Sequence, residues 1–431
     1  MEYGAFTDGR SVLLWSSFVI AFIMGAVVNK TNFCTMGAVS DAVNMGDFGR
    51  MRAWFLAIAV AVLGVILLET FGLVRPDDAF PPYRGGTFVW GENLIGGLLF
   101  GVGMTLASGC GNKTLIRIGG GNIKSIFVFA IIAIIAYYMV YPFPGTDKTL
   151  FSVLFIDWTR ALNEDNVATS FLTISLDGKQ DLGSLIAGAE SALTARLIIG
   201  ALIAVGILYF VFKSKDFRSG FDNILGGLVV GLAILAAWYV SSNISLNIDE
   251  EIYTLNSYAE QWDFVADSSE GKPAEIRPLS PQSYTFINPM GQMFGLVKGG
   301  FDGALVTFGV MAVLGVILGS FAWALISKGF RIEWFANGKD FGNHAIGAVL
   351  MGFGGVLAMG CTIGQAVTGF STLAIGSMLS FASIVLGSAL TMKVQYYKMV
   401  YEEEATFMKA LITGLVDMKL LPASMRKLDA I

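Results

Sequence analysis

Three cysteines carry most of the reactive chemistry available to this sequence, and each lies where a long apolar segment is interrupted. Cys361 lies in the Gly-rich stretch 354–369, Cys110 in a similar stretch at 103–114, and Cys34 in a looser version at 29–37. A cysteine in a membrane segment is usually a small apolar filler. Because all three coincide with breaks that cover little of the chain, we favour a functional interpretation.

The residues around each thiol favour a broken helix that points its end into a pathway. Irregular backbone at membrane depth needs a partner in the protein or a wet cavity. A helix beginning just after each cysteine would direct free N–H groups and a partial positive charge at an anion. A neutral thiol is a weak, polarizable hydrogen-bond donor, which suits a soft sulfur anion. Helix N-termini also lower the pKa of cysteine, so the residues alone leave the protonation state open.

The predicted substrate-binding residues are Cys34, Cys110, Cys361, Gly109, Gly111, Asn112, Gly360, Thr362, Gly364 and Gln365. Asn112, Thr362 and Gln365 can donate hydrogen bonds to oxyanion oxygens, with Gln365 the strongest candidate, or can satisfy the broken backbone. Lys113 and Arg117 are predicted to attract anions, although the usual excess of basic residues on the inner face explains them equally well.

The composition indicates an integral membrane protein. Hydrophobic residues make up 55% of the 431 residues and charged residues only 14%, and the mean hydropathy is +0.66. A net charge of −5 argues against nucleic-acid binding, which needs a basic surface. With one histidine and no Cys-x-x-Cys pair, the sequence predicts no metal site and no cofactor.

Apolar runs long enough to cross a bilayer predict an all-α, polytopic bundle with about nine spanning helices plus short broken helices. The predicted spans are 12–30, 52–74, 93–110, 124–143, 193–212, 223–242, 301–326, 344–360 and 372–393. The first is interpreted as a retained helix and not a cleaved signal. Two acidic loops separate the runs, at about 144–192 and 243–300. We expect one transport domain over residues 1–431.

The distribution of basic residues predicts the orientation. With nine crossings, segments on the face away from the acidic loops hold roughly two-thirds of the 28 Lys and Arg residues. We therefore expect a multi-pass protein of the inner cell membrane, with the acidic loops outside and the carboxyl end in the cytoplasm.

Internal similarity divides the chain into repeat-like units at about 12–143, 193–242 and 301–393. Residues 93–101 match 223–231, and a shift of 251 residues places Gly109 and Cys110 on Gly360 and Cys361. The middle copy has Ala237-Trp238-Tyr239-Val240 where the others have the break, so we expect an uninterrupted helix there. Repeats with interrupted helices at matching positions indicate a transport site.

At these motifs the sequence resembles the YeeE/YedE family of thiosulfate-transporter-like proteins with a sulfur-transport domain. The matching pieces are Asn32-Phe33-Cys34, Ser108-Gly109-Cys110 and Gly360-Cys361-Thr362-Ile363-Gly364-Gln365. The resemblance implies an hourglass of nine spanning helices in which Cys34, Cys110 and Cys361 contact thiosulfate in turn. It also implies a small cytosolic sulfur-carrier or sulfurtransferase partner. Lys113 stands where that family often has glycine.

The leading functional hypothesis is a transporter or facilitator for uptake of thiosulfate or a related small sulfur anion. The main alternative is a membrane thiol-disulfide or sulfur-transfer enzyme that uses the same cysteines as nucleophiles. An enzyme of that kind is expected to carry a Cys-x-x-Cys pair or a histidine beside the thiolate, and the sequence has neither at these positions. A structural membrane subunit with inert thiols is a third possibility.

Overall fold

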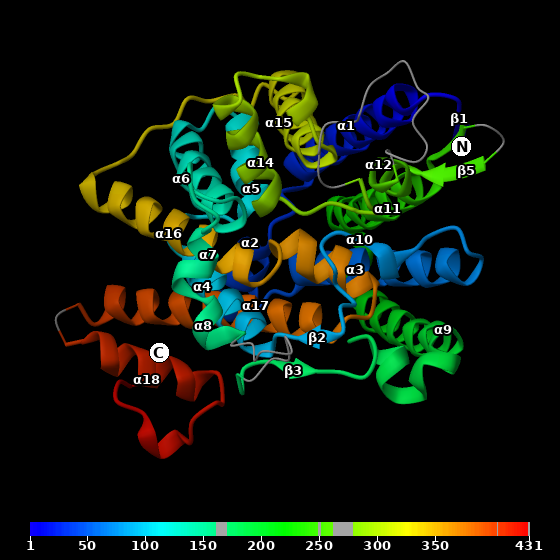
Figure 1. Cartoon of the computed structure of the whole chain (residues 1–431). Coiled ribbons are helices and arrows are strands. Elements are labelled where there is room, and N and C mark those ends of the chain that lie inside the picture. The colour runs from blue at the N-terminus through cyan, green and yellow to red at the C-terminus, as the bar shows by residue number, and fades with distance from the viewer. Residues whose placement is uncertain (161–169, 249–250, 262–278, 403, 430–431) are drawn as a thin grey trace.

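The chain folds into an all-α bundle whose long helices surround the interrupted segments (Figure 1). The computed structural model describes residues 1–160, 170–248, 251–261, 279–402 and 404–429. The helices are α1 (Phe6–Thr31), α2 (Thr35–Ser40), α3 (Gly49–Thr70), α4 (Trp90–Leu106), α5 (Gly111–Gly119), α6 (Ile123–Val140), α7 (Leu150–Leu154), α8 (Ile156–Thr159), α9 (Leu182–Phe212), α10 (Lys215–Ser219), α11 (Phe221–Asn243), α12 (Leu255–Glu260), α14 (Ile287–Lys298), α15 (Phe308–Ile326), α16 (Gly338–Leu357), α17 (Ile375–Val400) and α18 (Phe407–Asp417). Two π-helices, η1 (Asp41–Met45) and η4 (Ile363–Gly369), three short 3-10 helices, η2 (Pro76–Asp78), η3 (Gly303–Leu305) and η5 (Ala423–Met425), and five short strands complete the described elements.

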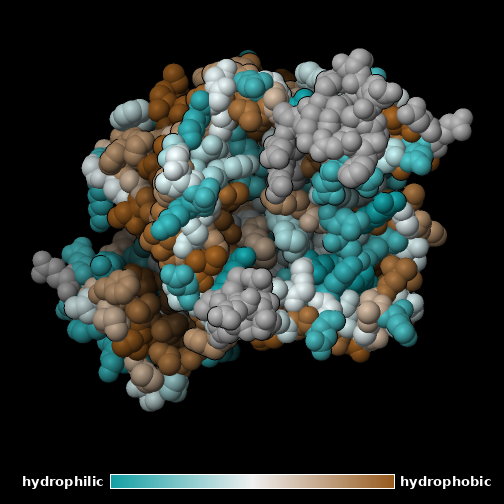
Figure 2. Space-filling view, in the orientation of Figure 1, coloured by the Kyte–Doolittle hydropathy of each residue, from teal (hydrophilic) through white to brown (hydrophobic). Residues whose placement is uncertain are grey.

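Eight helical stretches in the described part of the chain are long and apolar enough to cross a membrane. Sequence analysis predicted nine spans, so one prediction is not supported. The unsupported span, 344–360, overlaps α16, whose first turns carry Lys339, Asp340 and His344 and so lower its hydropathy. Hydrophobic residues occupy large parts of the molecular surface (Figure 2), as expected for helices that face lipid.

Short strands tie together segments that were predicted to share a membrane face. Strand β1 (Glu2–Tyr3) pairs in parallel with β4 (Ser245–Ile248), which also pairs with β5 (Glu251–Thr254). Strand β2 (Thr87–Phe88) pairs with β3 (Ile174–Ser175). The amino end therefore lies with the second acidic loop, and the connection before α4 lies with the first.

The two predicted acidic loops contain more structure than the sequence indicated. Helix α9 begins at Leu182, eleven residues before its predicted start, and turns at Gly188, which has a φ of 72°. Residues 287–298 form α14, which packs against α6 and α15 inside the bundle. The prediction of a loop over all of 243–300 is wrong there, because Pro289 and the polar and small residues around it obscure the signal of a buried helical face.

The matched copies of the repeat, α4 and α16, cross each other through glycines. A methyl group placed on Gly96 would lie 2.8 Å from the carbonyl oxygen of Gly354, and one on Gly103 would lie 2.6 Å from that of Gly347. Gly96 corresponds to Gly347 and Gly103 to Gly354 under the 251-residue shift. The first glycine of each copy, Gly96 or Gly347, therefore packs on the second glycine of the other copy, Gly354 or Gly103. A two-fold axis between the two copies would produce this reciprocal contact. As predicted, the middle copy, α11, runs uninterrupted from Phe221 to Asn243.

A buried ion-pair network fixes the connection between α3 and α4. The Arg84 guanidinium binds Glu69 at 2.6 Å and Asp77 at 3.0 Å, and Arg196 binds Asp181 and Glu69. Burial disfavours the charged form of Asp181, but hydrogen bonds from Arg196 and Ser184 hold its pKa at about 2. Glu69 is therefore part of a paired and buried cluster. Arg84 also donates to the Thr372 carbonyl at 2.8 Å, which joins this connection to the segment after η4.

We predict that Gly347→Ala destabilises the protein, because its new methyl group would lie 2.6 Å from the Gly103 carbonyl oxygen and 2.7 Å from the Ala107 nitrogen. Overpacking of this kind costs about 1–3 kcal/mol. Thermal unfolding in detergent measures the effect. Gly206→Ala on α9, where no heavy atom lies within 4 Å of the added methyl, is the matched control and should unfold at or above the wild-type temperature. Equal unfolding temperatures for the two variants would contradict the close crossing.

Candidate functional site

The three cysteine motifs have the same backbone geometry. A helix ends, one residue adopts the left-handed conformation, one residue follows, and then comes the cysteine. The left-handed residues are Asn32, Ser108 and Met359, with φ of 51°, 59° and 56°. In each motif the next residue donates its N–H to the carbonyl five positions earlier: Phe33 to Val28, Gly109 to Met104 and Gly360 to Gly355. This hydrogen-bond pattern satisfies the helix end and reverses the chain.

A helix begins directly after each thiol, as predicted. Cys34 is the N-cap of α2 and Cys110 is the N-cap of α5, both with extended backbone. After Cys361 the chain enters η4, whose N-cap is Thr362. Free N–H groups of three short helices therefore lie next to the three sulfur atoms. The geometry of the first motif matches the other two more closely than its sequence suggested.

The fold brings the three thiols together, although they are 76 to 327 residues apart in the chain. All three are buried and unpaired as disulfides. The Cys110 thiol interacts electrostatically with both Cys34 and Cys361. A methyl group on Gly111 would lie 3.7 Å from the Cβ of Cys361, so the second and third motifs touch.

Buried polar side chains surround the thiols, and several of their atoms have no hydrogen-bond partner among the described residues. These atoms are the Thr35 hydroxyl and the side-chain oxygens of Asn112 and Gln365. The Thr362 hydroxyl faces the Cys110 thiol. Gln365 donates from Nε2 to the carbonyl of Ala358 at 2.5 Å. That donor satisfies the broken helix, which was the alternative role considered for it.

Two hydroxyls at this site were missed by sequence analysis. A methyl group on Gly364 would lie 2.4 Å from Thr285 Oγ1, and one on Gly360 would lie 3.1 Å from it. Tyr83 packs its ring against Gly369, at the end of the same motif. Thr285 lies in a stretch predicted as an outer loop and Tyr83 in the connection before α4. Neither carried a sequence signal, since only tertiary packing brings them to Cys361.

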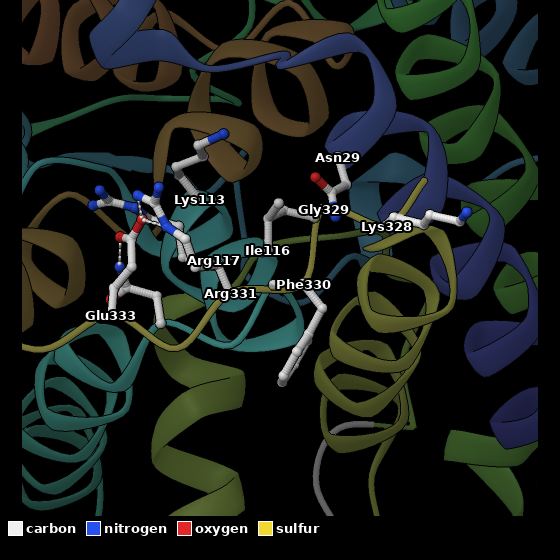
Figure 3. A pocket seen from close by; sticks show the side chains of 11 residues that line it. Asn29, Lys113, Ile116, Arg117, Lys328, Gly329, Phe330, Arg331 and Glu333 are labelled. Carbon is white, nitrogen blue, oxygen red and sulfur yellow. Dashed lines mark hydrogen bonds and ion pairs between the residues drawn. The ribbon is translucent and has the colours of Figure 1, made fainter. Parts of the chain in front are cut away.

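A basic cavity of about 610 Å³ lies beside the first two motifs (Figure 3). Its lining includes Lys113, Arg117, Lys328 and Arg331, opposed by Glu333. Lys113 Nζ lies 3.4 Å from Asn32 Oδ1. Arg117 donates to the Ser108 carbonyl at 2.9 Å. Lys113 and Arg117, the two cations predicted to attract anions, are therefore each hydrogen-bonded to the left-handed residue of one of the first two cysteine motifs.

The single carboxylate in this cavity stays ionised at neutral pH. Hydrogen bonds from Arg331 and Asn122 outweigh partial burial and lower the pKa of Glu333 below its ordinary value. One of the four positive charges is thus balanced. The cavity lining therefore keeps a net positive charge.

Comparison with known proteins agrees with this geometry. The model of the family described as "Sulphur transport" matches residues 30–390, which include all three cysteine motifs. The chain belongs to the sulphur transport family. It is similar to the thiosulfate transporter TsuA of Escherichia coli (strain K12), with 24% identity over 380 residues, covering 87% of this chain and 92% of the relative. It is also similar to the thiosulfate transporter TsuA of Spirochaeta thermophila, with 22% identity, covering 87% of this chain and 97% of the relative.

Membership of the sulphur transport family supports a transporter and gives no support to the enzyme alternative, because both relatives are named as transporters. The buried site offers thiols, hydroxyls and helix N-termini, none of which is a fixed cation. Such groups can bind an anion reversibly by hydrogen bonds. The lysine and arginine side chains lie in the adjoining basic cavity.

We predict that Gly364→Ala exposes the Cys361 thiol. The added methyl group would lie 2.4 Å from Thr285 Oγ1 and 2.8 Å from Thr285 Cβ, so one of the two segments must move. Alkylation by N-ethylmaleimide, followed at each cysteine by mass spectrometry, should be severalfold faster at Cys361 than in the wild type. Gly338→Ala, which meets no atom within 4 Å, is the control and should leave the rate unchanged. An unaltered rate in Gly364→Ala would show that Thr285 does not cover this thiol.

Proposed function

We propose that this protein takes up thiosulfate, or a closely related small sulfur anion, along a pathway lined by Cys34, Cys110 and Cys361. The convergence of three buried thiols at three helix N-termini carries the proposal. The named activity of both relatives, which match along most of their own length, supports it. The other predicted site residues line the same motifs and belong to the same binding surface.

The neutral lining suits passage better than tight binding. At an effective dielectric constant of about 20, one unit charge attracts another at 4 Å by about 4 kcal/mol, and a dianion is attracted about twice as strongly. A lysine or arginine in the centre would therefore slow release. Helix N-termini contribute only about half a unit charge each. Thiols add polarizable contacts for the terminal sulfur of thiosulfate, so binding remains reversible.

We infer the direction of transport from the charge distribution. We propose that the protein lies in the inner cell membrane with its acidic loops outside and its carboxyl end in the cytoplasm. The basic cavity then forms the cytoplasmic mouth of the pathway. The whole chain acts as one transport domain, since the motifs come from both ends of the sequence.

A cytosolic sulfur-carrier or sulfurtransferase protein is the proposed recipient of the imported anion. Lys328 and Arg331, both exposed at the rim of the basic cavity, suit a partner with an acidic surface around its reactive site. Handing the anion to such a partner at this mouth would keep the uptake reaction directional.

Uptake of radiolabelled thiosulfate into proteoliposomes tests the proposed function. The wild type should accumulate label, and Cys110→Ala and Cys361→Ala should each lower the initial rate at least tenfold, because each removes one contact in a continuous pathway. Thermal unfolding of both variants controls for folding. Absence of uptake by the wild type, together with failure of thiosulfate to protect the three cysteines from alkylation, would exclude thiosulfate as the substrate.

The basic cavity generates a separate prediction about ionic strength. Lys113→Gln should slow thiosulfate exchange across the liposome membrane severalfold at low salt. The deficit should shrink as salt rises above about 0.15 M, where screening acts within about 8 Å. Lys215→Gln removes an equal charge from the exposed helix α10 on the face assigned to the cytoplasm, and should leave exchange unchanged. Equal effects of the two substitutions would contradict a local role for Lys113.

A further inference from the structure

Two buried hydroxyls lie close to Cys361: that of Tyr83 has no hydrogen-bond partner among the described residues, and that of Thr285 has none there besides the Cys361 thiol. Leaving a buried polar group unpaired costs stability, so each such group in a folded protein needs an explanation. Neither side chain belongs to a cysteine motif. Both are nevertheless held beside the third motif by specific contacts.

Tyr83 is held in place from both sides. Its ring lies against Gly369, where an added methyl group would approach the ring carbon Cδ1 to 2.9 Å. The next residue, Arg84, is fixed by its ion pairs with Glu69 and Asp77. Only 1% of Tyr83 is exposed, and its phenol interacts electrostatically with the Cys361 thiol. Burial raises the pKa of Tyr83, so the phenol keeps its proton and remains a donor.

Thr285 is held between two glycines that flank Cys361. Its hydroxyl approaches the positions where Gly360 and Gly364 would carry a methyl group, and it faces the Cys361 thiol. Its neighbour Tyr284 is anchored, since Thr368 donates to the Tyr284 carbonyl at 2.6 Å. Thr285 also lines a small cavity of about 10 Å³ together with Pro81 and Asn288. That volume holds about one water molecule, so this side of the site is closed to an anion in the present structure.

We propose that the hydroxyls of Tyr83 and Thr285, beside Cys361, bind the oxygen atoms of the transported sulfur oxyanion. The assignment rests on the transport function proposed above. It gives the oxygen atoms of the anion to the hydroxyls and its sulfur atom to the thiols. Hydroxyl groups are strong donors to oxyanion oxygens, whereas thiols are weak donors that suit a terminal sulfur atom. A tetrahedral anion with oxygens at one end and sulfur at the other would then bind in one orientation.

Kinetics of thiosulfate uptake test this assignment with three variants. Tyr83→Phe removes one oxygen atom and no packing surface. Thr285→Val removes the hydroxyl and keeps the branched shape, and Thr285→Ser keeps the hydroxyl. A hydrogen bond to a charged group is lost in the first two, so their KM for thiosulfate should rise about tenfold or more while the maximal rate stays within about threefold. Thr285→Ser should keep a KM close to that of the wild type.

Tyr397→Phe is the matched control. Its hydroxyl donates to Asp417 at 2.6 Å between α17 and α18, so the substitution also removes a tyrosine hydroxyl but not one beside a thiol. Its KM should equal that of the wild type. Unchanged KM values in Tyr83→Phe and Thr285→Val would overturn the assignment, and so would a Thr285→Ser variant as impaired as Thr285→Val.

The outcomes separate this assignment from the proposed function. If the wild type does not transport thiosulfate, the proposed function fails, whereas normal transport with insensitive variants overturns only the role of the hydroxyls. Should Thr285→Val not fold in detergent, Tyr83→Phe decides the matter, since it preserves the packing against Gly369.

Discussion

The glycine contact between α4 and α16 is the constraint on which the rest of the site depends. Backbone carbonyls of one helix lie where side chains of the other would be, at Gly96 with Gly354 and at Gly103 with Gly347. This approach allows both helices to end within the bundle. Their reversed ends then carry Cys110 and Cys361 toward each other. Broken backbone at membrane depth persists only when buried in protein, and this crossing provides that burial.

The hydrogen-bond donors of the site and the fully charged side chains occupy different parts of the structure. The centre holds hydrogen-bond donors: thiols, hydroxyls and the N–H groups of α2, α5 and η4. Full charges lie around it, in the basic cavity beside Lys113 and in the paired cluster around Arg84. Unpaired charges are costly to bury, and a central cation would hold a dianion too firmly for release. In the proposed function, this arrangement attracts an anion at the mouth and lets it pass the centre by weak contacts.

Particular elements show how far the sequence could be interpreted. The cysteine motifs, the helix starts after each thiol and the uninterrupted α11 were predicted correctly, because glycine breaks and apolar runs are local signals. Helix α14 was missed, since prolines and polar residues around it resemble a loop. The span at 344–360 was overestimated, because α16 begins with charged and polar residues.

The sequence by itself determined the membrane environment, the broken helices and the identity of the thiols, because hydropathy and glycine spacing act over a few turns of chain. Tertiary structure alone decided which groups meet. Cys34, Cys110 and Cys361 converge, and Tyr83 and Thr285 join them from segments that carry no motif. The physical reason is that these contacts depend on how closely helices approach and on where ion pairs such as Arg84 with Glu69 fix the connections. Neither property can be inferred from any single stretch of the chain.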